Sequence, residues 1–203
     1  MNKKVMTAIA LLPAFALLPV FLGSHQNPNF SNLATLSAEA VVLRDGKTYF
    51  VNLPLLIGAE TTINVVYVRG AIYYFAIALP QDMGEPLQKL EIYQTAGFDS
   101  VNFYSNATIA YLQSPSGDRV PISSQTEILL SQDSDRQKVT VTFDPQIPAT
   151  NQLSSTLIVG LIPVQNPRYS DTYMFGVTAF PQGDRPNPQF LGYGRLSFYE
   201  SRY

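Results

Sequence analysis

The feature that most limits the possible folds is an alternation of apolar and polar residues, with a period of two, along most of the chain after residue 40. The segment Val139–Phe143 reads Val-Thr-Val-Thr-Phe, so three apolar side chains share one face and two threonines share the other. This period is typical of a β-strand that is buried on one face. The pattern therefore predicts strands and leaves little room for helices.

Three longer segments carry the same period. Ala71–Leu79 is apolar on both faces, which favours a central strand, and Tyr173–Phe180 also alternates. In Phe190–Tyr199 the period places Phe190 on the same face as Leu196, with two glycines between them that leave room for a bulge. We expect each of these segments to be one strand.

Turn signals separate the strand segments. Asp45-Gly46 lies between two short apolar runs and predicts a hairpin with a primed turn. The only candidate helix is Gly84–Leu90, and a strand that starts at Leu87 competes with it. Lys138–Phe180 predicts three consecutive antiparallel strands, the natural start of a Greek key.

Roughly nine or ten short strands at even spacing predict a sandwich or barrel. We therefore predict an all-β fold: a single antiparallel β-sandwich, immunoglobulin-like with Greek-key connections, that occupies residues 41–203. An N-terminal export segment precedes this domain.

That export segment is predicted for residues 1–40, as a signal peptide and leader. Lys3 and Lys4 precede the uncharged run Ala8–Leu22, which is shorter than the ~20 residues of a membrane-spanning helix. The best small-x-small match predicts cleavage after Ala40. The alternative is an uncut segment that acts as an anchor, and we expect membrane contact only in that case.

The chain has few of the side chains that usually act in catalysis. The chain has 1 His and no Cys, and His25 lies before the expected cleavage site, so residues 41–203 contain neither. Ser–His and thiol catalysis are then excluded, as are zinc sites built from these residues. The net charge of −2 gives no electrostatic footprint for nucleic acid. We predict no enzyme activity and no cofactor.

Paired carboxylates are the acid–base chemistry that remains. Glycoside hydrolysis needs two carboxyl groups about 5–10 Å apart beside a cleft. The candidate acids lie mostly in predicted turns or on outward faces: Glu85, Glu91, Asp99, Glu127, Asp144, Asp171, Asp184 and Glu200. A carboxylate-dependent glycan-active enzyme therefore stays as an alternative function, and it requires two acids in one concave pocket.

Asp133 and Asp135 are the candidate calcium ligands, since they lie two residues apart in a predicted loop. Calcium takes six to eight oxygen ligands, and no Gly or Glu follows at the offsets of a calcium loop. We expect a solvated turn here and no metal site.

Exposed aromatic residues are the candidate binding groups. Alternation or loop position predicts that Tyr93, Tyr169 and Tyr193 face solvent, where a tyrosine can stack on a sugar or anchor a protein partner. Packing within the sheets accounts for most of the other aromatic residues.

Several longer motifs carry a family resemblance. The most specific is Phe175–Pro181, which reads Phe-Gly-Val-Thr-Ala-Phe-Pro, and Gly84–Leu87 adds Gly-Glu-Pro-Leu. Over nearly all of residues 41–203 the chain resembles a cyanobacterial family of exported proteins, the domain of unknown function 2808. The resemblance implies a photosynthetic bacterium and a periplasmic, thylakoid-luminal or cell-surface location. It implies no catalytic residues, because the family has no assigned activity.

These observations predict an exported cell-envelope protein that serves as a non-enzymatic binding or structural module. The expected partner is an envelope protein or a glycan. The main alternative is a carbohydrate-binding module that uses its exposed tyrosines.

Overall fold

The structure, a computed structural model, describes residues 41–42, 46–131, 135–150 and 155–201. All of them belong to one compact unit, Leu36–Tyr203. The predicted export segment and its cleavage site lie outside the described residues. The described strands are β1 (Val41–Val42), β2 (Thr48–Tyr49), β3 (Leu55–Thr61), β4 (Tyr73–Leu79), β5 (Leu87–Ala96), β6 (Ile109–Gln113), β7 (Arg119–Pro121), β8 (Ser124–Leu130), β9 (Gln137–Ile147), β10 (Ser155–Leu161), β11 (Thr172–Pro181) and β12 (Gln189–Ser197).

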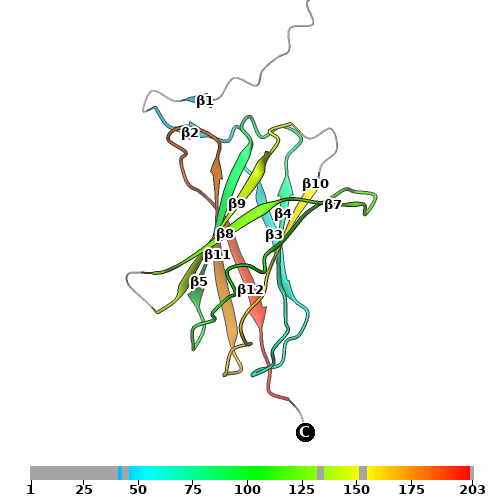
Figure 1. The fold of residues 1–203 in the computed structure, drawn as a ribbon, viewed down its shortest axis with the longest axis vertical. Helices are drawn as coiled ribbons and strands as arrows, with labels where there is room; N and C mark the ends of the chain where they lie inside the picture. Colours follow the sequence, from blue (N-terminus) through cyan, green and yellow to red (C-terminus); the bar gives the residue numbers. More distant parts are fainter. Residues whose placement is uncertain (1–40, 43–45, 132–134, 151–154, 202–203) are drawn as a thin grey trace, which may run out of the picture. The chain divides into compact units, whose positions relative to one another are not determined.

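Ten of these strands form two five-stranded antiparallel sheets (Figure 1). The first sheet has the order β3-β4-β10-β6-β7, and the second has the order β12-β11-β5-β9-β8. The order β3-β4-β10-β6 matches strands A-B-E-D of an immunoglobulin domain, and β12-β11-β5 matches strands G-F-C. The prediction of an all-β, immunoglobulin-like antiparallel sandwich is therefore confirmed.

The core lies between the two sheets and follows from the period of two. In β4, Tyr73, Phe75 and Ile77 point inward and are fully buried, while Tyr74 and Ala76 point outward and are half-buried. Inward side chains of the second sheet meet them, and the ring of Phe175 lies 5.8 Å from that of Phe75 and 6.1 Å from that of Tyr73. Burial of both inner faces supplies most of the driving force for folding.

The local pairing predictions have mixed outcomes. β1 and β2 pair antiparallel, with Val41 opposite Tyr49, as the predicted hairpin requires. The primed turn predicted at Asp45-Gly46 lies in part outside the described residues, since Asp45 is not among them. β5 begins at Leu87, so the competing strand, not the candidate helix, forms there. The three strands predicted within Lys138–Phe180 exist as β9, β10 and β11. They do not pair with one another, however, because β10 lies in the first sheet and β5 lies between β9 and β11 in the second.

The predicted face of Phe190 is wrong. Phe190 points outward and is 45% exposed, while its neighbour Leu191 is buried. The cause is a register shift between β11 and β12, where Gly192 adopts a φ of 135°. An extra residue in a strand reverses which side chains face the core, so Phe190 lies out of phase with Leu196.

Buried polar bonds close one end of the sandwich. The Tyr73 hydroxyl donates to Oδ1 of Asn166 at 2.9 Å, and the Asn166 side chain donates to the carbonyl groups of Ile63 and Val65. Tyr173, near the start of β11, donates its hydroxyl to Asp99 and contacts the carbonyl of Tyr169 four residues upstream. This last contact is the tyrosine corner of immunoglobulin-like folds.

The buried tyrosines predict a loss of stability in alkaline solution. Burial raises the pKa of Tyr73, with smaller contributions from Tyr173 and Asp99. In the unfolded chain a tyrosine ionises near pH 10. A raised folded pKa therefore contributes stability that is complete below pH 10 and is lost as the pH rises further.

The measurement is urea unfolding of the wild type and of Tyr73→Phe at pH 8 and at pH 11. At pH 8 the variant should be less stable by about 1 kcal/mol, since it lacks one hydrogen bond. Between the two pH values it should lose less stability than the wild type. Equal losses in the two proteins would contradict the prediction.

Candidate functional site

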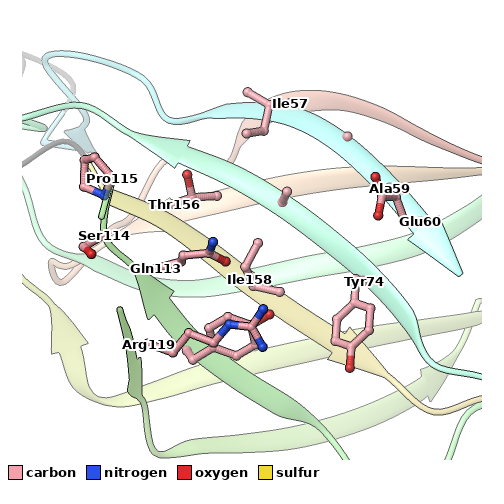
Figure 2. Close-up of a pocket in the computed structure, with 13 residues that line it drawn as sticks. Ile57, Ala59, Glu60, Tyr74, Gln113, Ser114, Pro115, Arg119, Thr156 and Ile158 are labelled. Carbon is pink, nitrogen blue, oxygen red and sulfur yellow. The ribbon is translucent and has the colours of Figure 1, made fainter. Parts of the chain in front are cut away.

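A groove crosses the outer face of the first sheet. It has a volume of about 730 Å³, and its lining side chains come from all five strands of that sheet and from the turn after β6 (Figure 2). This volume lies within the range of small-molecule binding sites. The lining residues are Ile57, Gly58, Ala59, Glu60, Tyr74, Ala76, Tyr111, Gln113, Ser114, Pro115, Arg119, Thr156 and Ile158.

The groove forms because small residues lie beside large ones on the outer face of this sheet. The pairing register places Gly58 beside Ala76, then Ile158, then Tyr111 in one row across the sheet. Side chains in such a row stand side by side on the same face. The glycine and the alanine form a low floor, and the larger residues rise beside it.

Tyr74 is fixed against the sheet. It faces Gly160 on β10, where an added Cβ atom would lie 2.9 Å from the Tyr74 ring. Only glycine gives the ring room to lie this close to the backbone. The ring is half-buried, so part of it stays accessible from the groove.

Arg119 and Tyr111 form the opposite wall. The guanidinium carbon of Arg119 lies 5.0 Å from the centre of the Tyr111 ring, which is a cation–π contact. Within the described part of the chain, Arg119 forms no salt bridge with a carboxylate. Its charge therefore stays available to a ligand.

The remaining polar groups line the groove around its apolar centre. Thr156 and Gln113 are neighbours in the row that ends at Arg119, and Glu60 lies on β3, across the sheet. Glu60 is the only carboxylate in the groove lining. An acid–base pair for glycoside hydrolysis needs two carboxyl groups, so this groove does not provide one.

The candidate acids lie outside the groove, and two of them form salt bridges. Glu91 lies 3.5 Å from the ammonium groups of both Lys89 and Lys138, and Asp99 lies 3.4 Å from Arg168. Partly exposed pairs of this kind hold side chains in place and contribute little free energy.

Two of the predicted binding aromatics lie on the second sheet. Tyr93 on β5 and Tyr193 on β12 are both paired with Gly176 of β11, so they lie in one row on the outer face of that sheet. Tyr193 is 53% exposed and packs against Phe190, with 4.8 Å between the ring centres. Tyr93 is half-buried, because its ring covers Gly176.

Tyr169 lies apart from these two, in the loop before β11. It is 45% exposed, and its ring centre lies 4.4 Å from that of Phe98. The structure thus brings Tyr93 and Tyr193 together but not Tyr169, and none of the three lines the groove. Their role in binding stays a prediction.

The calcium candidates yield no site. Asp135 lies in an exposed bend, and Asp133 lies outside the described residues. In the described ranges no group of three or more His, Cys, Asp or Glu residues is placed to hold a metal ion. The same ranges contain no helix that is long and apolar enough to cross a membrane.

Comparison with known families identifies relatives of this domain. The sequence profile described as "Protein of unknown function (DUF2808)" matches residues 47–198. The chain belongs to this family. The matched range covers the sandwich from β2 through β12, which includes the whole groove. No curated protein matches the chain.

This member of the DUF2808 family is only distantly similar to proteins of solved structure. The group B streptococcus pilus 2b backbone protein has 11% identity and a TM-score of 0.39, and the match covers 66% of this chain and 56% of that one. The collagen-binding domain from a Staphylococcus aureus adhesin has 7% identity and a TM-score of 0.37, with coverage of 71% and 98%. TM-scores this low carry no argument about function.

Sequence reasoning missed the groove. Ala71–Leu79 is apolar on both faces, but Tyr74, Tyr111 and Arg119 were not among the predicted binding residues. The available signal was the alternation of Tyr74 with Ala76 and Ala78, one large and two small residues on an outward face. The partner strands that complete the groove are not visible in that local pattern.

The two faces of β4 predict opposite responses to substitution. Ala76→Phe adds a ring to the groove floor and should change the free energy of unfolding by less than about 0.5 kcal/mol, as surface substitutions usually do. Ile77→Ala, at the next residue, removes buried core volume and should cost about 2–5 kcal/mol. Urea unfolding of both variants measures the difference. A large loss in Ala76→Phe would show that the outer face is part of the core.

Proposed function

We propose that this protein is a non-enzymatic binding module of the cell envelope and that the groove on the first sheet is its ligand site. The observation that carries the proposal is the lining of the groove. Two half-buried tyrosines and Arg119, which forms no salt bridge with any described residue, surround a floor of small residues. Concave sites with an apolar centre and a few polar groups are the usual form of a binding site.

The chemistry of the groove supports binding over catalysis. Its lining contains no His or Cys, and Glu60 is its only acid. General acid–base hydrolysis of a glycan would need a second carboxyl group, and nucleophilic catalysis would need a base beside a serine. A carbohydrate-binding module therefore remains the stronger alternative within the binding class, and a glycan-active enzyme the weaker one.

The proposed location of this module is outside the cytoplasm of a cyanobacterial cell, in the periplasm, in the thylakoid lumen or at the cell surface. The uncharged run near the N-terminus supports export, and the sandwich of residues 41–203 is the exported part in this proposal. Contact with a membrane belongs to the proposal only if the N-terminal segment stays uncut. No nucleic-acid partner is proposed, because the net charge is −2.

Filling the groove should abolish binding to the envelope. The Ala76→Phe protein should co-sediment with isolated cyanobacterial envelopes at least tenfold less than the wild type, because the added ring occupies the site. The matched control is Thr142→Phe, which adds the same ring to an outward position on β9 of the second sheet. Equal binding by all three proteins would reject the groove as the site.

Export predicts a defined mature N-terminus. A C-terminally tagged full-length chain, expressed in a cyanobacterium, should appear outside the cytoplasm and start at Val41. Cell fractionation and N-terminal sequencing measure both properties. A mature chain that starts before His25, or a chain retained in the cytoplasm, would contradict this prediction.

A further inference from the structure

The ligand of the groove must be recognised by side chains. The strands at the centre of the first sheet, β4, β10 and β6, are paired on both sides, so their backbone groups are used within the sheet. An extended peptide binds a sheet chiefly by adding a strand at a free edge. A peptide lying across this groove would leave its own polar backbone groups over an apolar floor, where unmade hydrogen bonds are costly.

A saccharide fits the same surface better. Pyranose rings present apolar C–H faces and carry hydroxyl groups around their rim. The groove offers the matching arrangement. Tyr111 stands beside Ile158 in the row that forms the floor, Thr156 and Gln113 lie in the next row on one side, and Tyr74 lies in the next row on the other side. Tyrosine combines an apolar body with a polar tip, so it can contact both parts of a sugar.

The groove has one charged residue near each edge of the sheet, and the two charges are opposite, so they determine which end of a ligand lies at which edge. Arg119 lies on β7, at one edge of the sheet, and Glu60 lies on β3, at the opposite edge. Neither forms a salt bridge among the described residues. A guanidinium group pairs best with a carboxylate, through two parallel hydrogen bonds. Glu60 repels a carboxylate and accepts hydrogen bonds from hydroxyl or amide groups instead.

We infer that the groove binds an acidic saccharide that contains both uronic-acid and neutral sugars. The carboxylate of one sugar pairs with Arg119, a neutral sugar lies beside Glu60, and the two tyrosines contact the ring faces. This inference rests on the proposed function, since it names the ligand class of the same groove.

The test compares three oligosaccharides of equal length by isothermal titration calorimetry with the purified protein. They are a tetrasaccharide of alternating glucuronate and N-acetylglucosamine, a galacturonate tetramer and an N-acetylglucosamine tetramer. The alternating tetrasaccharide should bind at least tenfold more tightly than either of the others. The neutral tetramer lacks the group that pairs with Arg119, and the galacturonate tetramer places a charge beside Glu60.

Substitutions of Arg119 and Glu60 test the role of each charge in binding. Arg119→Ala should weaken binding of the alternating tetrasaccharide at least tenfold, and Arg119→Lys should recover only part of that loss because lysine lacks the planar fork. Glu60→Gln should strengthen binding of the galacturonate tetramer at least threefold, because it removes the repulsion. Both side chains lie at the surface, so the variants should fold like the wild type, and circular dichroism checks this.

The outcomes separate this inference from the proposed function. Equal affinity for the neutral and alternating tetrasaccharides, with no effect of Arg119→Ala, would overturn the acidic ligand. If no oligosaccharide binds but Ala76→Phe still abolishes envelope binding, the saccharide inference fails and the groove remains a binding site. If neither assay detects binding, both proposals fail.

Discussion

The rest of the structure depends on the aromatic cluster that joins the inner faces of the two sheets. Phe175 of β11 connects the two sheets in this cluster, since its ring lies within 6.1 Å of the rings of Tyr73 and Phe75 of β4 and of Phe103. Aromatic pairs at these separations add to the free energy of burial and also restrict how the rings pack. The cluster therefore fixes both the separation of the sheets and the face that each strand turns inward.

The groove follows from that choice of faces. Once Tyr73, Phe75 and Ile77 point into the core, the period of two directs Tyr74, Ala76 and Ala78 outward. An outward strand face composed mainly of alanine cannot fill the space beside larger residues of the neighbouring strands. The same alternation that builds the core thus leaves a hollow on the opposite side of β4.

The sequence predicted the parts of this fold that depend on local pattern. The inward faces of β9 and β11 agree with the alternation of their residues, whereas β4 is apolar on both faces, so its alternation does not show which face points inward. The pairing of β1 with β2 agrees with the hairpin predicted between them. The predicted orientation of Phe190 was wrong because a bulge at Gly192 changes the alternation within one strand. Long-range pairing was not predictable, since nothing local in β4 indicates that β10 lies beside it. Arg119 and Tyr74 come together only through such pairings, which is why the candidate site was missed.

Because the groove lies on the outer face of the sheet, different residues determine ligand affinity and the stability of the fold. The floor is the outer face of strands whose inner face is already fixed by the core, so a ligand can bind without any movement of the sheets. A site preorganised in this way loses little conformational entropy on binding. Substitutions on the floor then change affinity without removing core contacts, whereas substitutions of the inward residues change stability. A site placed between the two sheets would not allow this separation, because every side chain there also contributes to the core.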